Sequence, residues 1–223
     1  MRPERRAALR GLYAVTPGEA DDARLFASVS AVLAGGARLV QYRDKALDPA
    51  RRLDQARGIA ALCREHGALF IVNDDLALAL AVGADGVHLG REDGEVAAAR
   101  AAWPGGLLGV SCYDRPSLAA AAAAAGADYV GIGSVFASAV KPGAVHAPLE
   151  ALGEAGRRSG LPVAAIGGID ESNAAQAVAA GADMIAVITA LFAAPDPRAA
   201  ARALSRPFEP DERSHVRTQP AAL

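Results

Sequence analysis

Eight short apolar runs, each followed by a polar or glycine-containing stretch and then by an alanine-rich segment, constrain most strongly how this chain folds. The runs are, in order, LYAVT, RLVQYR, LFIVND, GVHLG, LLGVSC, YVGIGSVF, PVAAIGG and MIAVIT. Strands that are apolar on both faces are typical of a parallel sheet whose two faces are covered by helices. The pattern therefore predicts a series of strand-helix units.

The segments between the runs contain residues that are typical of helix starts and helix ends. Proline suits the first turn of a helix, and Pro49 and Pro116 stand where such turns are expected. Glycine suits the left-handed position just past a helix end, which Gly67, Gly126 and Gly181 would occupy. The expected helices include residues 23–34, 49–66, 115–125, 149–158 and 171–180.

A repeated sequence motif helps to choose between two architectures built from such units, a closed barrel and an open sheet. Gly-Ala-Asp recurs in AVGADGVHLG, AAGADYVGIG and AAGADMIAVI, each time between a helix end and a strand. A doubly wound open sheet would use the same units, but the repeat and the count of eight favour closure. We predict an α/β fold, a compact (β/α)8 TIM barrel, as one domain over residues 1–205. The polar, proline-containing tail over 206–223 is expected to be disordered.

The composition limits the partners of the protein. The chain has 23 Lys and Arg against 25 Asp and Glu, so no overall positive charge favours nucleic acid or an acidic membrane. No segment has the length and hydropathy of a membrane span or a signal peptide. Cys63 and Cys112 lack metal-binding spacing and are expected to be reduced. We expect a cytoplasmic protein with small-molecule partners. The sequence gives no basis for predicting its oligomeric state.

Cations follow the second run. Functional groups of a barrel collect at the carboxyl ends of its strands. In QYRDK, the alternate positions Gln41, Arg43 and Lys45 lie on one side if the chain stays extended. Two cations and an amide can then converge on an oxyanion. A solvated loop of charges is the alternative interpretation.

Carboxylates follow the third and fourth runs. NDD contains Asp74 and Asp75, and GRED contains Glu92 and Asp93. A carboxylate pair from adjacent strand ends makes an oxygen-rich site of the kind that Mg²⁺ uses when it shares the phosphates of a substrate. Asp75 as a helix cap and Glu92 as a solvated side chain are the alternatives.

Glycines and backbone amides follow the last two runs. In GGID, Gly167 and Gly168 would let the backbone approach a phosphate closely. In AVITALF, the backbone amides of Ile188 and Thr189 would complete this phosphate-binding site. A phosphate site after strands seven and eight is common in this fold.

Three further positions bear on the site. The loop FASAVKPG, after the sixth run, carries a single cation, Lys141. Ser111 ends the fifth run and can donate a hydrogen bond to an anion, although a serine there is more often a turn residue. His88 lies inside an apolar strand and is expected to be a hydrogen-bonded core residue rather than a catalytic base.

Together the strand ends resemble a known family. LYAVT, QYRDK, IVNDD, ADGVHLGRED, GVSCYD, ADYVGIGSVF, AIGGI and AVITALF, in this order from Leu12 to about Ala193, are similar to the motifs of thiamine-phosphate synthases. The resemblance implies a (β/α)8 barrel and a Mg²⁺-dependent transferase of thiamine biosynthesis. Its members join 4-amino-2-methyl-5-(diphosphooxymethyl)pyrimidine to a thiazole phosphate, 4-methyl-5-(2-phosphoethyl)thiazole, and release pyrophosphate and thiamine phosphate.

The resemblance also implies residue roles. The residues implied to bind the pyrimidine diphosphate are Gln41, Arg43, Lys45, Asn73, Ser111 and Lys141, with Ser138 as a polar neighbour of Lys141. Those implied to hold the thiazole phosphate are Gly168, Ile188 and Thr189. The implied Mg²⁺ ligands are Asp74 and Asp93. Arg43, Lys45 and Lys141 would stabilise the departing pyrophosphate, so no protein nucleophile is required.

The loop after the sixth run departs from the family pattern. Members commonly show Phe-x-Thr-x-Thr-Lys, whereas this chain keeps one hydroxyl at Ser138 and has Val140 in place of the second. Two other functions stay open: a thiazole tautomerase, which aromatises the thiazole phosphate without joining it to a pyrimidine, and a noncatalytic barrel that senses a phosphorylated ligand. Neither requires both the cations of QYRDK and the two carboxylates, so their joint presence favours the synthase.

Overall fold

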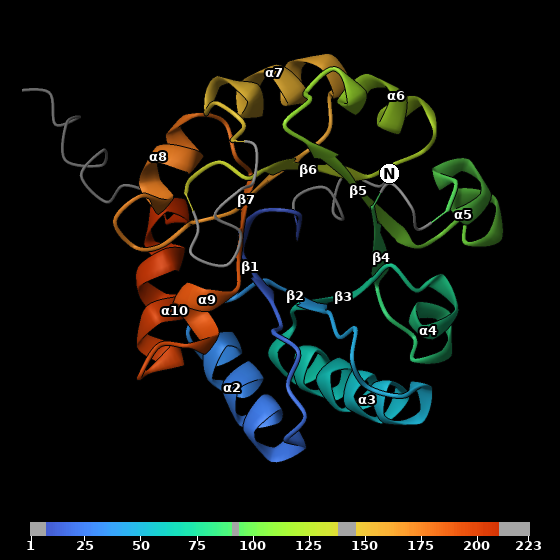
Figure 1. Ribbon diagram of the computed structural model, residues 1–223, viewed down its shortest axis with the longest axis vertical. Coiled ribbons are helices and arrows are strands. Elements are labelled where there is room, and N and C mark those ends of the chain that lie inside the picture. The colour runs from blue at the N-terminus through green and yellow to red at the C-terminus, as the bar shows by residue number, and fades with distance from the viewer. Residues whose placement is uncertain (1–7, 91–93, 138–145, 210–223) are drawn as a thin grey trace, which may run out of the picture.

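The eight apolar runs form a closed parallel barrel. A computed structural model describes residues 8–90, 94–137 and 146–209. Its strands pair in sequence order, and β1 pairs with β8 to close the sheet, so the predicted (β/α)8 fold is confirmed. Figure 1 shows the ring of strands with the helices outside it. The strands are β1 (Gly11–Val15), β2 (Leu39–Tyr42), β3 (Leu69–Asn73), β4 (Gly86–Leu89), β5 (Leu107–Tyr113), β6 (Tyr129–Gly133), β7 (Val163–Ile166) and β8 (Met184–Val187).

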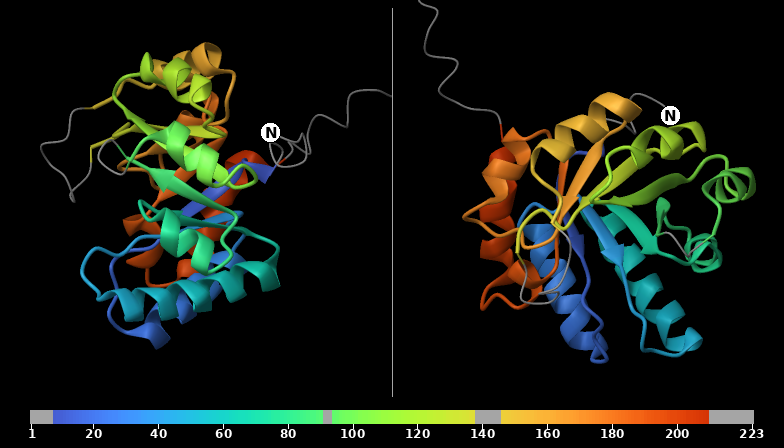
Figure 2. Two further views of the ribbon diagram at one scale, coloured as in Figure 1. Left: turned by 90° about the vertical axis from the view of Figure 1, so that its right-hand side faces the viewer. Right: turned by 45° about the horizontal axis from the view of Figure 1, so that its top comes forward.

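The helices alternate with the strands along the chain and cover the outside of the barrel (Figure 2). They are α2 (Asp22–Ala34), α3 (Pro49–His66), α4 (Leu76–Ala81), α5 (Val96–Ala102), α6 (Leu118–Ala124), α7 (Glu150–Ser159), α8 (Ala174–Ala179), α9 (Thr189–Phe192) and α10 (Pro197–Ser205). A 3₁₀ turn, η1 (Arg206–Phe208), follows α10 and contacts α8. Residues 206–209 of the expected tail therefore belong to the folded part, and residues 210–223 lie outside the described residues. No helix of the described part is long and apolar enough to cross a membrane.

Two helices are shorter than the sequence predicts. The helix expected at 171–180 begins only at Ala174, because Asp170 and Asn173 exchange hydrogen bonds in a turn: the Asp170 amide donates to Asn173 Oδ1 over 3.0 Å. The helix expected at 115–125 begins at Leu118, so Pro116 lies in the preceding turn. The expected glycine positions are confirmed, since Gly67, Gly126 and Gly181 all have positive φ.

Alternate residues of each strand serve two separate apolar cores. Inward-facing side chains, which include Leu39, Ile71 and Leu107, fill the barrel itself. Their strand neighbours, such as Val40 and Leu108, point outward and pack under the helices. This period of two is what a strand buried on both faces requires. It also determines which residues near the carboxyl ends can reach the barrel mouth.

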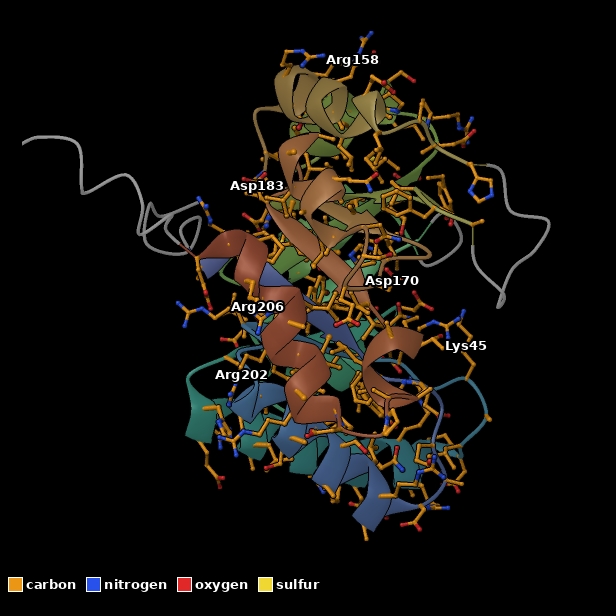
Figure 3. All side chains as sticks on the ribbon, turned by 90° about the vertical axis from the view of Figure 1, so that its left-hand side faces the viewer. Lys45, Arg158, Asp170, Asp183, Arg202 and Arg206 are labelled. Atoms are coloured by element: carbon orange, nitrogen blue, oxygen red, sulfur yellow. The ribbon has the colours of Figure 1, made fainter. Side chains whose placement is uncertain are left out.

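The Gly-Ala-Asp repeat has a structural role at the amino end of the barrel. Asp85, Asp128 and Asp183 each accept a hydrogen bond of 2.9 Å from the first residues of the preceding strand in the sheet. The donors are the amides of Phe70, Leu108 and Val163. In Figure 3, Asp183 lies at the opposite end of the barrel from Lys45 and Asp170. The repeat therefore fixes the starts of the strands and is remote from their carboxyl ends.

We predict that Asp85→Ala lowers the free energy of unfolding by about 1.5–3 kcal/mol, because the Phe70 amide loses a charged acceptor. Urea unfolding measures the loss. Asp54→Ala on α3 is the matched control. The Asp54 carboxylate is exposed and makes a long ion pair of 3.7 Å with Arg57, so its loss should cost less than about 1 kcal/mol. Equal unfolding free energies for the two variants would contradict the assigned role of the repeat.

Candidate active site

Gln41 and Arg43 stand at the end of β2, as predicted. Gln41 points into the barrel, is only 5% exposed, and its Nε2 donates to the Tyr13 hydroxyl over 2.7 Å. The Arg43 amide donates to the buried Thr16 hydroxyl over 2.9 Å, which ties the end of β2 to the end of β1. The half-buried Arg43 side chain thus starts from a fixed backbone.

The ends of β2 and β3 meet through an ion pair. Lys45 Nζ lies 3.2 Å from Asp74 Oδ2, with side chains 63% and 26% exposed. Asp74 has a left-handed backbone, with φ of 65°, and its amide donates to the His88 carbonyl over 2.8 Å. A non-glycine residue in this conformation is strained and is a frequent feature of functional sites. The structure therefore brings together the predicted cation and the predicted metal ligand.

The neighbouring carboxylate belongs to the fold. Asp75 accepts a hydrogen bond from the Leu78 amide over 2.8 Å and caps α4, and it also contacts Arg52 over 3.1 Å. The capping alternative is therefore the correct one for Asp75. Asn73, the last residue of β3, is half-buried and pairs in register with His88 of β4.

His88 and Ser111 make a direct contact across β4 and β5. His88 Nε2 lies 2.9 Å from Ser111 Oγ, and its Nδ1 lies 3.1 Å from the Tyr129 hydroxyl. His88 is thus a hydrogen-bonded barrel residue, as predicted. Ser111 stands where β5 shifts register against β6, at an irregularity that re-aims side chains at barrel rims.

Two buried tyrosines were missed by the sequence analysis. The hydroxyls of Tyr13 and Tyr129 lie 2.8 Å apart inside the barrel. Burial raises the pKa of both phenols, so both stay protonated at neutral pH. The available signal was a polar aromatic residue at an inward position of each otherwise apolar strand, in LYAVT and in ADYVGIG.

The glycine turn after β7 packs against the loop after β6. Gly168 has φ of 63°, and a Cβ there would meet the carbonyl oxygens of Phe136 and Ala137. The Phe136 amide in turn donates to the Gly167 carbonyl over 3.1 Å. Glycine is therefore required at 168 by both its conformation and its surroundings. The two loops form one wall of the barrel mouth.

Ile188 and Thr189 begin α9, after β8. The amides of Leu191 and Phe192 donate to the Ile188 carbonyl, which leaves the earlier amides of this short turn without an intrahelical acceptor. Ile188 packs against the core inside the barrel, and Thr189 is exposed. This places the predicted amides beside the glycine turn, since β7 and β8 are neighbours.

Part of the predicted site lies outside the described residues. These positions are Asp93, Ser138 and Lys141, together with Val140. Their predicted roles stay predictions.

Asp74 meets the requirements of one Mg²⁺ ligand. Its carboxylate is a hard oxygen donor, and 26% exposure of the side chain leaves it accessible from the barrel mouth. In the described part of the chain, no three His, Cys, Asp or Glu side chains gather as a complete metal site. The donor chemistry of Asp74 therefore fits a single Mg²⁺ ligand.

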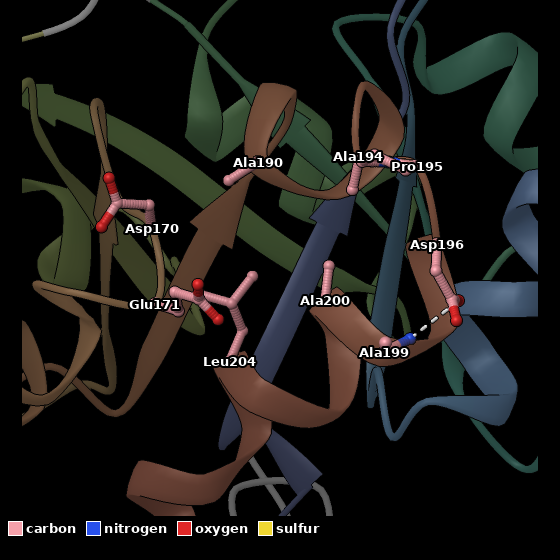
Figure 4. Close-up of a pocket in the computed structure, with 9 residues that line it drawn as sticks. All are labelled: Asp170, Glu171, Ala190, Ala194, Pro195, Asp196, Ala199, Ala200 and Leu204. Atoms are coloured by element: carbon pink, nitrogen blue, oxygen red, sulfur yellow. Dashed lines mark hydrogen bonds between the residues drawn. The ribbon is translucent and has the colours of Figure 1, made fainter.

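An acidic groove lies beside α9 and α10, and its lining includes Ala190, the residue after Thr189. It has a volume of about 440 Å³, and its lining includes Asp170, Glu171 and Asp196 but no cation among the described residues (Figure 4). Asp196 caps α10 by accepting from the Ala199 amide, the bond drawn in Figure 4. Three carboxylates repel phosphate, so the candidate site is the barrel mouth and not this groove.

The fold and the mouth define a (β/α)8 barrel with cations on one side and backbone amides on the other. Residues 12–191 match the family described as thiamine monophosphate synthase. The chain belongs to this family.

Individual relatives agree over nearly the whole chain. A thiamine-phosphate synthase of Thioalkalivibrio sulfidiphilus is 57% identical over 203 residues, which cover 90% of this chain and 96% of the relative. A thiamine-phosphate synthase of Chromobacterium violaceum is 59% identical over 198 residues, with 88% and 95% covered. The solved structure of a thiamine phosphate pyrophosphorylase from Pyrococcus furiosus is 36% identical and has a TM-score of 0.80. The match covers 90% of this chain and 96% of that structure.

We predict that Gly168→Ala disrupts the glycine turn and weakens binding of inorganic phosphate at least about tenfold, because the new Cβ would meet two carbonyl oxygens. Gly160→Ala is the matched control: Gly160 has a similar φ of 68° but nothing within 4 Å of an added Cβ. Both variants bear the same conformational strain, and only Gly168→Ala should lose phosphate affinity by calorimetry. Equal affinities would show that the turn does not hold phosphate.

Proposed function

We propose that this protein catalyses the thiamine-phosphate synthase reaction, in which an aminopyrimidine diphosphate and a thiazole phosphate give thiamine phosphate and pyrophosphate. The full-length similarity carries the proposal: two relatives with 57% and 59% identity, matched over at least 95% of their length, are thiamine-phosphate synthases. The cations and amides at the barrel mouth supply the chemistry that two phosphorylated substrates need.

The pyrimidine diphosphate would bind on the β2 to β5 side of the mouth. Arg43 and Lys45 would contact its diphosphate from the loop after β2, and Lys141 from the loop after β6. Gln41, Asn73 and Ser111 would surround the pyrimidine ring. Lys45 already lies 3.2 Å from Asp74, so a bound diphosphate would compete with, or share, this ion pair.

The thiazole phosphate would bind on the opposite side, after β7 and β8. Gly168 permits close approach of the backbone, and the first amides of α9, at Ile188 and Thr189, would donate hydrogen bonds to the phosphate. This would separate the phosphate from Arg43 and Lys45, which follow β2. The thiazole ring would then face the pyrimidine across the barrel axis.

The chemistry needs charge stabilisation rather than a nucleophilic side chain. The bond between the pyrimidine methylene and the diphosphate oxygen breaks, and its electron pair leaves with pyrophosphate. The thiazole nitrogen lone pair then forms the new carbon–nitrogen bond, and no proton has to be removed. Arg43, Lys45 and Lys141 would stabilise the negative charge of the leaving group, while the amino group of the pyrimidine spreads the positive charge of the methylene.

Mg²⁺ is proposed as the cofactor, held by Asp74 and Asp93. When bound, it would neutralise part of the charge of the diphosphate. The partly exposed Asp74 carboxylate and its strained, fixed backbone support this assignment. A cytoplasmic location likewise stays a prediction of the sequence.

The decisive experiment supplies the purified protein with both substrates and Mg²⁺. We expect thiamine phosphate and pyrophosphate in equal amounts, measured by chromatography and a coupled phosphate assay. Tautomerisation of the thiazole phosphate without pyrophosphate release would instead support the tautomerase alternative. Binding of a substrate without any product, by a protein shown to be folded, would support the sensor alternative.

We predict that Asp74→Asn lowers kcat about 10²-fold and raises the Mg²⁺ concentration required for half-maximal rate, because a charged ligand near the diphosphate is lost. The affinity for the thiazole phosphate should change less than about threefold, since its proposed site lies on the opposite side. We expect Asp93→Asn to behave in the same way.

The matched control for this prediction is Asp75→Asn, which alters the adjacent carboxylate, whose partners are the cap of α4 and Arg52. Its kcat and Mg²⁺ requirement should match those of the unaltered protein at a temperature where both are folded. A loss of turnover in Asp75→Asn as large as that in Asp74→Asn would refute the metal assignment.

A further inference from the structure

One strand glycine of the barrel is not required by the fold. The eight strands contain five glycines: Gly11, Gly86, Gly109, Gly131 and Gly133. Gly11 has a φ of 111°, a conformation that favours glycine. A Cβ on any of Gly86, Gly109 and Gly133 would overlap with a residue of the next strand. Neither reason applies to Gly131.

Gly131 could be replaced by alanine as far as its surroundings are concerned. It lies in the middle of β6 and does not have a positive φ. An added Cβ would lie 3.4 Å from His88 Cε1 and 3.8 Å from His88 Nε2, which are ordinary van der Waals distances. Glycine in a strand costs stability relative to alanine, and it often marks a place where a ligand approaches the backbone. Since packing in the described part of the chain does not exclude a methyl group at this position, the space beside Gly131 is available to a ligand.

This space lies inside the barrel, beside a residue assigned to the pyrimidine. Along β6, Tyr129 faces the interior and Val130 faces the helices, so Gly131 faces the interior. It pairs in register with Ser111 of β5, and His88 Nε2 lies 2.9 Å from Ser111 Oγ. His88 and Ser111 are both partly exposed, so a ligand in the barrel mouth can reach the space between them and Gly131.

The polar wall of the space is held in place from below. Hydrogen bonds run from Gln41 through Tyr13, Tyr129 and His88 to Ser111, and we refer to them as the buried chain of hydrogen bonds. His88 has a partner on each of its ring nitrogens, so its ring cannot move aside without losing one of them. The size of the space is therefore fixed.

The space is also small and largely apolar. Gly131 is itself buried, so its surroundings leave room for a small group only. On the side away from Ser111, Gly131 pairs in register with the buried Ala164 of β7. The described atom nearest to an added Cβ is a ring carbon, His88 Cε1. These neighbours favour a methyl group over a polar group.

The proposed orientation of the pyrimidine directs a methyl group toward this space. In the six-membered ring, C2 lies opposite C5. The diphosphate is attached through the methylene at C5, and Arg43 and Lys45 would hold it at the rim. The methyl group at C2 is then the part of the ring that lies deepest in the barrel.

We propose that the space beside Gly131, between His88 and Ala164, receives the 2-methyl group of the pyrimidine diphosphate. The inference rests on the proposed function, because that function places the pyrimidine beside Ser111. Gly131 is then a specificity-determining residue. It lets the 2-methyl ring enter fully, whereas an alanine at this position would favour a ring without the methyl group.

The unaltered protein provides the first test. The dissociation constants of the 2-methyl pyrimidine diphosphate and of its 2-desmethyl analogue are measured by calorimetry with Mg²⁺ present. We expect the 2-methyl compound to bind at least about threefold more tightly, because burial of one methyl group contributes about this factor. Equal dissociation constants would show that the methyl group is not buried and would overturn the proposal. This measurement does not depend on the folding of any variant.

Gly131→Ala provides the second test. The added Cβ fills the space, so the 2-methyl compound should bind at least about tenfold more weakly, while the affinity of the 2-desmethyl compound should change less than about threefold. A variant that only disturbed Ser111 or His88 would weaken both compounds equally. An unchanged ratio of the two dissociation constants would therefore overturn the proposal, as would a loss of affinity confined to the thiazole phosphate.

Gly156→Ala is the matched control. Gly156 belongs to α7, which lies outside the barrel (Figure 1), and an added Cβ there would also make an ordinary contact, 3.5 Å from Val163 Cγ2. The ratio of the two dissociation constants should equal that of the unaltered protein. A shift as large as that in Gly131→Ala would show that the effect is not local and would contradict the assignment.

Binding and turnover separate the two levels of inference. If the ratio shifts as expected in Gly131→Ala but the unaltered protein forms no thiamine phosphate, the proposed function fails and the role of Gly131 stands. If thiamine phosphate forms and the ratio does not shift, the role of Gly131 fails alone. If neither pyrimidine binds to the folded protein, both are wrong.

Discussion

The pairing of β1 with β8 is the constraint on which the whole arrangement depends. Gly11 of β1 pairs with Met184 of β8, and its amide donates to the Asp183 carbonyl, so the sheet has no free edge at this seam. Closure brings the carboxyl ends of all eight strands to one rim. Residues as distant in sequence as Lys45 and Gly168 thereby become parts of one mouth.

The rim is divided between two kinds of anion recognition. The ends of β2 and β3 supply side-chain charge, with Lys45 and Asp74 in contact. The ends of β7 and β8 supply a glycine turn and backbone amides, which bind an anion without a full positive charge. Such a division suits two substrates that carry different phosphate groups and must meet in one orientation.

Below the rim, polar side chains stand among the apolar inward positions of the barrel. Tyr13 pairs in register with Leu39, and its hydroxyl belongs with Gln41 to the buried chain of hydrogen bonds. A chain of this kind requires every member to be satisfied, so it fixes the rotamers of Gln41 and Ser111 from below. The packing of the barrel thereby positions the two side chains that are assigned to the pyrimidine.

The sequence predicted the strands, the closed barrel and the positions after β2, β3, β5, β7 and β8. These followed from period, spacing and resemblance, which act locally along the chain. The starts of α6 and α8 were misplaced, because side-chain turns such as that of Asp170 and Asn173 delay the helix. The Tyr13 to Tyr129 contact joins residues 116 positions apart in sequence, and only the closed barrel reveals it. The common role of Asp85, Asp128 and Asp183 likewise needed the strand register.

A crystal structure with thiamine phosphate, pyrophosphate and Mg²⁺ bound together tests the division of the rim most directly. We predict pyrophosphate beside Arg43, Lys45 and Asp74, and the phosphate of thiamine phosphate on the amides of Gly168 and Thr189. The pyrimidine ring should lie between Gln41 and Ser111. Both phosphate groups on the same side of the mouth, or either of them in the acidic groove at Asp170 and Asp196, would contradict the account.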